Sequence, residues 1–400
     1  MRGSVFPLFP CLLGAVCLAA SCATPPPPLV EGEFPVAVFD SPMDGYERES
    51  LAARPVEGDP PEGGIRYWST PFGRLDCHGC YVSVLNRGTV EAPEWELWEN
   101  GWGDTLDLRG IFVRRGPSLA TLPPYELALS ASAIDDVPEP AEHCKLPPRE
   151  PWRLAEGRGF TRPCVIRDPE SGYVLLACVC PDYLPGRVSL FPALATSPDG
   201  TPGSWTYRGR LKGEPQEEEI QRDYPVWSDG GTLFRLPGGT WRILLNGFGN
   251  RTLVELHAET LDGPWRFLRG GDGAIRELLP HPVTGEGAFP SCFPHVLRVS
   301  DSEWHLWLSD VWPCQSIWHF FSEDGLAWRP YGRQPEITRD AVNGHAIKCL
   351  RTHLSADGTK IVGLLSVWGD SLPGRPGEKG WTLFRTTLPV GAPPEERSAE

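Results

Sequence analysis

The 400-residue sequence has little that would form helix, bind nucleic acid or span a membrane. Almost no stretch keeps an apolar period of 3.6 residues without meeting one of its 44 prolines or 44 glycines, so helices are expected to be scarce. The formal net charge is −15, and no lysine and arginine cluster offsets it. Nucleic acid is therefore excluded as a partner, because its phosphates would be repelled. The apolar run from Val5 to Ala20 is too short for a spanning helix.

The cysteines lack the spacing of a complete zinc site. Cys77-His-Gly-Cys80 could form half of one, but no second pair stands at matching spacing, so no metal ligand is assigned. Nine of the twelve cysteines remain once Cys11, Cys17 and Cys22 are set aside. An odd number leaves at least one thiol free, even in a compartment that permits disulfides.

The N-terminal segment has the features of an export signal. Arg2 precedes the apolar run, which ends in Leu18-Ala-Ala-Ser-Cys22. This end resembles a bacterial lipobox, with Ala19 where that pattern usually has leucine. We expect a signal peptide over residues 1–21, lipidation of Cys22 and a Pro-rich tether over residues 22–42; cleavage after Ala23 is the alternative. The predicted product is an exported, membrane-anchored lipoprotein facing the periplasm or the cell surface, which touches the membrane only through its lipid.

What the sequence does contain is an internal repeat. Three landmarks of one segment recur 63 residues later: Arg235, Trp241 and Trp265 as Arg298, Trp304 and Trp328. Each copy has a short apolar strand, a turn of Gly, Ser or Asp, and a second strand that opens on Trp, which is typical of a β-hairpin. A period of roughly 50 to 65 residues with about four strands per unit is typical of a propeller blade.

The repeat predicts the domain organisation. Blades begin near Arg162, Asp223, Phe289 and Val342, and residues 43–150 supply strand-like runs for one more. We therefore predict an all-β, five-bladed β-propeller as a single domain over residues 43–392, followed by a disordered tail over residues 393–400. Because the innermost strand of each blade starts beside the axis, residues just before these strands should converge on one funnel.

Residues 155–370 resemble the five-bladed propeller glycosidases of glycoside hydrolase families 43, 32 and 62. The resemblance rests on the blade starts Thr161-Arg-Pro-Cys-Val-Ile166 and Phe293-Pro-His-Val-Leu297, and on Ser-x-Asp-Gly-x-x-Trp blade ends. It implies an inverting hydrolase with an Asp base, a pKa-tuning Asp and a Glu acid. In the blade register the base position falls on Arg162, the tuning position on Asp229 and the acid position on Cys292.

The candidate site residues follow from this register. The catalytic candidates are carboxylates that could reach the funnel: Asp229, Asp223, Glu286 and Asp76. The substrate-binding candidates are polar and aromatic residues at blade starts and strand edges: Arg162, His295, His345, Trp227, Tyr224 and Trp312. No cofactor is expected; a calcium ion at the axis, near His295, His345 and His78, is the alternative.

Two functions are compatible with these residues. The leading hypothesis is an exported carbohydrate-active propeller, similar to glycoside hydrolases, that binds a glycan or oligosaccharide in the axial funnel and could hydrolyse it. If active, it would be an inverting, family 43-like glycoside hydrolase. The alternative is a non-catalytic sugar-binding or protein-interaction lipoprotein with a degenerate active site. Arg162 and Cys292 favour the alternative, because neither a guanidinium nor a thiol replaces a carboxylate in this reaction.

Overall fold

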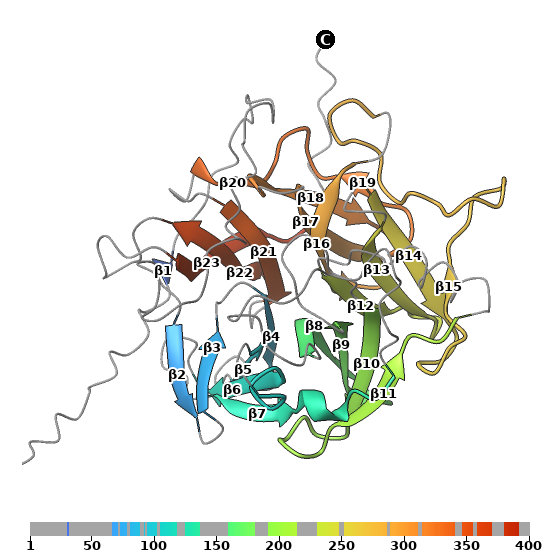
Figure 1. Cartoon of the computed structure of the whole chain (residues 1–400). Helices are drawn as coiled ribbons and strands as arrows, with labels where there is room; N and C mark the ends of the chain where they lie inside the picture. The colour runs from blue at the N-terminus through green and yellow to red at the C-terminus, as the bar shows by residue number, and fades with distance from the viewer. Residues whose placement is uncertain are drawn as a thin grey trace, which may run out of the picture.

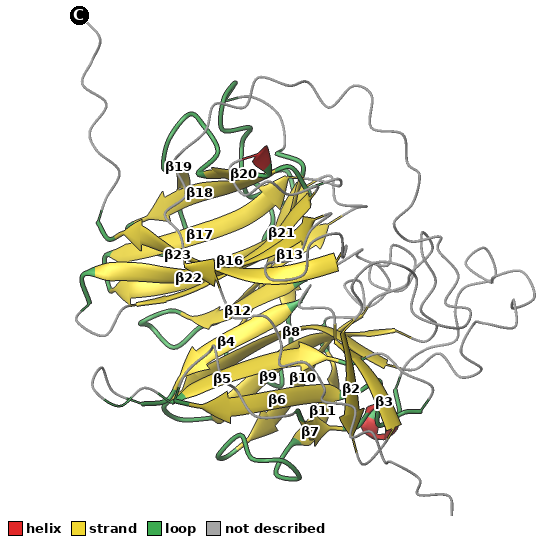
Figure 2. Ribbon diagram, turned by 90° about the vertical axis from the view of Figure 1, so that its left-hand side faces the viewer, coloured by secondary structure: helices red, strands yellow, loops and turns green. Residues whose placement is uncertain are grey.

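The structure is a computed structural model of the chain, and it is built from β-sheets. It describes residues 30–31, 66–70, 73–77, 81–88, 92, 94–101, 105–117, 125–136, 159–180, 191–213, 230–247, 252–285, 289–310, 314–340, 346–354, 358–369 and 380–391. In this part of the chain, regular structure is almost entirely strand, with helix confined to short turns such as Ala131–Ala133 (Figure 2). The all-β prediction is thereby confirmed.

Four sheets are antiparallel meanders of consecutive strands, which we number as blades one to four. Blade one contains β4 (Val82–Asn86), β5 (Trp95–Asn100), β6 (Ile111–Gly116) and β7 (Glu126–Leu129). Blade two contains β8 (Gly159–Asp168), β9 (Gly172–Cys180), β10 (Phe191–Ser197) and β11 (Thr206–Arg210). Blade three contains β12 (Gly231–Arg235), β13 (Trp241–Gly247), β14 (Thr252–Ala258) and β15 (Arg266–Phe267). Blade four contains β16 (Ser291–Ser300), β17 (Glu303–Asp310), β18 (Ser316–Ser322) and β19 (Arg329–Pro330), with β20 (Ile337–Thr338) also paired to β18.

The C-terminal sheet departs from this pattern. It contains β21 (Ala346–Leu354), β22 (Lys360–Gly369) and β23 (Gly380–Pro389), and its fourth strand is β1 (Val30–Glu31), which runs parallel to β23. We therefore count four regular blades among the described strands, against the five predicted. The difference arises because the last repeat supplies only three consecutive strands. β1 lies within the segment expected to be a tether, and β2 (Arg66–Thr70) and β3 (Gly73–Cys77) form a separate two-stranded sheet.

The sheets are arranged around a common centre, as in a propeller (Figure 1). The innermost strands β4, β8, β12, β16 and β21 contact one another in this order, and β21 contacts β4 in turn. All five begin at the same end of the axis, so their first residues are neighbours. This arrangement positions the candidate site.

The hydrophobic core lies between neighbouring blades. Trp98 of blade one packs edge-to-face on Trp205 of blade two, with ring centroids 5.3 Å apart. The repeated landmarks Trp241 and Trp304 are both buried, in the clusters between blades two and three and between blades three and four. Large aromatic side chains contribute most of the burial energy at such contacts. The repeated tryptophans therefore mark inter-blade packing.

The repeated arginines and tryptophans form the same hairpin in blades three and four. Arg235 stands opposite Trp241, and Arg298 stands opposite Trp304. Each guanidinium lies over the facing indole ring, 5.4 Å from its centroid in blade three and 5.2 Å in blade four. This cation–π contact explains why both residue types recur at one spacing.

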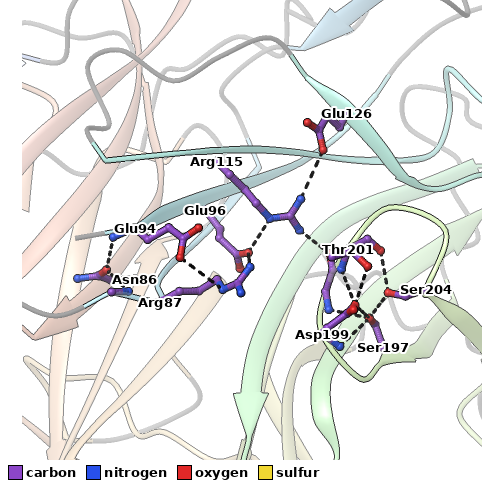
Figure 3. Close-up of polar contacts among 12 residues, drawn as sticks. Asn86, Arg87, Glu94, Glu96, Arg115, Glu126, Ser197, Asp199, Thr201 and Ser204 are labelled. Atoms are coloured by element: carbon purple, nitrogen blue, oxygen red, sulfur yellow. Dashed lines mark hydrogen bonds and ion pairs between the residues drawn. The ribbon is translucent and has the colours of Figure 1, made fainter. Parts of the chain in front are cut away.

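Polar contacts also join blades one and two (Figure 3). Glu96 is fully buried, and its carboxylate accepts from Arg115 Nε at 2.8 Å and from Arg87 Nη1 at 3.3 Å. Arg115 also donates to the carbonyl oxygen of Gly200, in the turn that closes blade two. A buried carboxylate needs such pairing, because losing one partner would leave its charge uncompensated.

Candidate functional site

Three innermost strands carry a β-bulge at the same place. In β8 the bulge is shown by Thr161 facing Cys178 while Cys164 faces Leu176, so two residues oppose one. The register of β16 and of β21 shifts in the same way, at residues 293–294 and 348–349. A bulged residue stands outside the hydrogen-bonded ladder and can be aimed in a new direction. The bulges therefore present residues 162, 293 and 348 at equivalent positions.

The backbone at two of these bulges has a conformation that side chains rarely adopt. Arg162 has φ 57° and Phe293 has φ 56°. Each precedes a proline, which has no N–H to lose from the ladder. The amide of Arg162 donates to Asn100 Oδ1 at 3.1 Å, which holds the bulge against blade one. A positive φ in a non-glycine residue stores on the order of 1–3 kcal/mol of strain and is often found at functional sites.

Five residues, each in or directly before one of the five innermost strands, meet at this end of the axis, and we call them the axial cluster: Tyr81, Arg162, Gly230, Phe293 and Lys348. Tyr81 directly precedes β4, and Gly230, with φ 104°, directly precedes β12. A Cβ atom on Gly230 would lie 3.4 Å from Phe293 Cδ1 and 4.0 Å from Arg162 Cβ. The absence of a side chain at Gly230 thus lets its neighbours approach the axis.

Tyr81 is at the centre of the axial cluster. Its hydroxyl lies 3.5 Å from Arg162 Nη2 and 3.3 Å from Lys348 Nζ. Both cations also lie over its ring, at 4.8 Å for the guanidinium carbon and 5.0 Å for the ammonium nitrogen. The Phe293 ring is 5.5 Å from that of Tyr81. Arg162 is buried, whereas Tyr81 and Lys348 are partly exposed. The cluster combines two positive charges with two aromatic rings.

Three buried cysteines pack against the aromatic residues of the axial cluster. Cys292, Cys314 and Cys349 form one apolar group with Phe293, against which Tyr81 packs. The Cys292 thiol lies 3.1 Å from the carbonyl oxygen of Asp310 and 3.7 Å from Cys314 Sγ. The thiol at the expected acid position is therefore a packing group.

Asp310 is a buried carboxyl group next to these cysteines. Its oxygens accept from the amide of Gln315 at 2.7 Å and from the hydroxyl of Ser316 at 2.7 Å. Burial raises the pKa of Asp310 to about 6, although these hydrogen bonds oppose the shift. The carboxyl group is thus held inside the blade by its own loop.

His295 lies further along the axis than the axial cluster. Its Nε2 accepts from the amide of Thr352 at 2.9 Å, and its ring is stacked on Trp307. Burial, with a smaller contribution from Arg351, lowers the pKa of His295 to about 3, so the ring is neutral. It lines an axial cavity of about 450 Å³, together with residues of every innermost strand. Substrate binding by His295 stays a prediction; its Nε2 is bonded to the neighbouring strand.

The remaining predicted residues fall into two groups. Asp76 belongs to β3, opposite Tyr67, in the separate two-stranded sheet and not in blade one. The others lie outside the described residues: Cys22, His78, Asp223, Tyr224, Trp227, Asp229, Glu286, Trp312 and His345. Where side chains are described, no three His, Cys, Asp or Glu residues are grouped so as to hold a metal ion. Nor does that part of the chain contain a helix long and apolar enough to cross a membrane.

The axial cluster includes residues that the sequence reasoning missed. Tyr81 and Lys348 carried no recognised motif. The sequence could have indicated the bulges of β8 and β16, since Arg162 and Phe293 each precede a proline near the start of an innermost strand. No proline follows Lys348, so the sequence does not indicate the bulge in β21.

The sequence matches no family model and no curated protein. The structure is similar to that of an exo-β-1,3-galactanase from Clostridium thermocellum, with a TM-score of 0.51 and 14% identity. The match covers 81% of this chain and 64% of the galactanase, so the chain spans less than two thirds of that protein. At this identity the likeness concerns the fold alone.

Two further solved structures show weaker likeness. A family 43 β-1,3-galactosidase with galactodeoxynojirimycin has a TM-score of 0.48 and 13% identity, covering 82% of this chain and 99% of that one. An α-L-arabinofuranosidase from Lactobacillus brevis has a TM-score of 0.49 and 11% identity, covering 78% and 90%. The three proteins named are glycosidases, and the likeness to the galactanase agrees with the propeller arrangement of this chain.

Proposed function

We propose that this chain is an exported carbohydrate-active propeller that binds a glycan or oligosaccharide at the axial cluster. One observation carries the proposal: three equivalent bulges bring Arg162, Phe293 and Lys348 together at the end of the axis where Tyr81 lies. Aromatic rings offer a flat surface to the apolar face of a sugar, and the polar groups around them can bind its hydroxyls. The fold shared with glycosidases supports this assignment.

Binding without hydrolysis is the function that the described residues favour. Inverting hydrolysis needs two carboxyl groups about 6.5–9.5 Å apart. The axial cluster contains none, and Arg162 and Cys292 occupy the expected base and acid positions. Hydrolysis is the second candidate, supported by Gly230, which lies in the axial cluster and directly follows Asp229 in the sequence. It would require Asp229 together with Asp223 or Glu286.

The two candidates are separated by one set of measurements. We would test galacto-, arabino-, xylo- and fructo-oligosaccharides for binding by calorimetry, and the corresponding aryl glycosides for turnover. Binding without turnover is expected. Tyr81→Ala should abolish binding, because it removes the central ring of the axial cluster. Turnover that disappears in Asp229→Asn but persists in Asp262→Asn, a change in an exposed turn, would instead establish the hydrolase. The proposal fails if no saccharide binds.

The C-terminal sheet, in this proposal, is a fifth blade that closes the ring with the help of β1. Support comes from Arg351, which is buried and donates to the carbonyl oxygens of Val82 in blade one, at 2.9 Å, and Pro294 in blade four, at 3.0 Å. Arg351→Met should therefore lower the free energy of unfolding by about 1–3 kcal/mol. An unchanged urea midpoint would argue against closure at this position.

Export and lipidation also belong to the proposal, and they are supported by the sequence of residues 1–22 alone. Metabolic labelling with a radioactive fatty acid in a bacterial host should label the wild type and not Cys22→Ala. A wild-type protein without label would rule out the lipid anchor and leave glycan binding untouched.

A further inference from the structure

We infer that Cys292 and Cys314 are a disulfide-forming pair, which an external disulfide oxidises as blade four folds. Both residues carry free thiols in this structure, and their Sγ atoms lie 3.7 Å apart. A disulfide bond shortens this distance to about 2.05 Å. Cys292 directly precedes Phe293 of the axial cluster, and Cys314 lies shortly before β18. The bond would therefore tie the bulge of β16 to the start of β18.

A hydrogen bond holds the Cys292 thiol beside its partner. Cys292 faces Ser309 in the ladder between β16 and β17, and its side chain is buried. Its Sγ donates to the carbonyl oxygen of Asp310 at 3.1 Å. With its proton directed at that oxygen, the sulfur is the acceptor in the contact with Cys314. The two sulfur atoms consequently face each other before any bond forms between them.

The backbone around Cys314 is fixed from both sides. Its carbonyl oxygen accepts from the amide of Ile347 at 2.8 Å. The next amide, that of Gln315, donates to the carboxyl group of Asp310 at 2.7 Å. Cys314 also has φ 59°, which a non-glycine residue keeps only where its surroundings determine it. Since the backbone is held, rotation of the two side chains is the movement that would close the pair.

The reaction is thiol–disulfide exchange with the external disulfide. One cysteine, as its thiolate, attacks a sulfur of that disulfide, so that a mixed disulfide forms and one external thiolate leaves. The second cysteine, as its thiolate, then attacks the mixed disulfide, which forms the bond between Cys292 and Cys314 and releases the second external thiolate. The two protons lost by the cysteines end on the released thiolates. The pair is thus oxidised, and one external disulfide is reduced to two thiols.

Burial decides when the exchange can take place. The residues Cys292 and Cys314 are each only 1% exposed, so an external disulfide cannot reach either sulfur once blade four has folded. The bond therefore forms during folding and is shielded afterwards. Cys349 belongs to the same buried group, but the sulfur–sulfur contact described for Cys292 is with Cys314. Export would bring the chain into contact with external disulfides, whereas the pairing itself depends neither on export nor on glycan binding.

The test is refolding of the full chain under oxidising conditions. The chain would be reduced and unfolded in urea, refolded in mixtures of reduced and oxidised glutathione, alkylated and digested with trypsin for mass spectrometry. Trypsin cleaves at Arg298, between the two cysteines, and at Arg339, between Cys314 and Cys349. In most refolded molecules the peptides of Cys292 and Cys314 should be linked, with the loss of two hydrogens, and Cys349 should be alkylated. The same oxidation kept in urea is the control and should yield mixed pairings.

Variants and the folded chain provide the matched controls. Cys314→Ser should remove the cross-link, whereas Cys164→Ser, which changes a buried thiol of blade two, should retain it. Folded, reduced wild type should react with the same glutathione mixture far more slowly than the refolding chain, and equal rates would overturn oxidation during folding. Refolded wild type in which Cys292 and Cys314 are both alkylated, or are linked mainly to other cysteines, would overturn the pairing and leave glycan binding untouched.

Discussion

Blades three and four share a hairpin, a register and a repeated Arg–Trp pair, yet they fill one pair of core positions with different chemistry. Arg242 contacts Glu255 across β13 and β14, one step diagonally from its direct partner His257. His305 contacts His319 across β17 and β18 in the same diagonal relation. The scaffold therefore specifies that two polar groups meet at this place, and not which groups they are.

The Arg–Glu pair of blade three and the His–His pair of blade four respond differently to acid. The Arg242 guanidinium contacts the carboxylate of Glu255, which is 1% exposed. Burial raises the pKa of Glu255, and Arg242 opposes the shift. In blade four, His305 Nδ1 lies 2.8 Å from His319 Nε2, and His305 Nε2 lies 3.0 Å from Glu303. A bond between two imidazoles needs a proton on one and a lone pair on the other, so this pair depends on protonation.

The largest effect is expected from breaking the pair in blade three. Arg242→Met leaves Glu255 buried without its cation, which should lower the free energy of unfolding by about 3–5 kcal/mol. Urea unfolding followed by tryptophan fluorescence would measure it. The double variant Arg242→Met/Glu255→Leu should recover most of the loss. A loss below about 1 kcal/mol in the single variant would show that water already screens the carboxylate.

Acid should destabilise blade four through its histidines. The pKa of His295 falls from 6.5 to about 3 in the folded chain, and burial also lowers that of His305. Their contribution to stability is complete above pH 6.5 and is lost as the pH falls, because the unfolded chain takes up protons first. For His295 the loss is roughly 2 kcal/mol between pH 6.5 and 5. Glu255 has the opposite sign, since its raised pKa favours the folded state below about pH 4.5.

The corresponding measurement is the urea midpoint at several pH values. His295→Gln keeps an acceptor for the amide of Thr352 but cannot titrate. It should flatten the pH dependence between pH 6.5 and 5. An identical slope in wild type and variant would contradict the assignment to His295.

The smallest effect on stability is expected from substituting the repeated arginines. Arg235 pairs with Asp168 at 3.3 Å and Glu170 at 2.8 Å, and Asp168 is only 5% exposed. Arg298 pairs with the exposed Asp301. Arg235→Met should therefore cost about 1 kcal/mol, and Arg298→Met less than about 0.5 kcal/mol. Thermal unfolding of both variants would check the order, and a reversed order would mean that the cation–π contact outweighs the ion pairs.

The fold could be predicted from the sequence where the pairing of adjacent strands produced a repeat of residues. Arg235 and Trp241 recur as Arg298 and Trp304 because each pair faces across one hairpin, which is a short-range contact. The C-terminal sheet was harder to predict, because its fourth strand, β1, comes from the far end of the chain. A partner more than 350 residues away leaves no period in the sequence.

The axial cluster could be predicted only in part for a similar reason. Arg162 was found because it precedes a proline at a blade start, where the resemblance to glycosidases directed attention. Tyr81 and Lys348 meet where β21 contacts β4, and nothing near either residue in the sequence indicates the other. His295 was assigned to the funnel from its place in the blade, and it lines the axial cavity with its Nε2 bonded to the amide of Thr352.

The bulges make the axial end of this molecule modular. A residue that takes no part in strand pairing can be exchanged without changing the ladder on either side. Positions 162, 293 and 348 are therefore three variable positions on an unchanged set of paired strands. Under the proposed function, a library varied at these positions alone would explore ligand preference, within the limits that burial and positive φ set at Arg162 and Phe293. Divergence among propellers of this kind could proceed in the same way, with new specificities arising before any strand is altered.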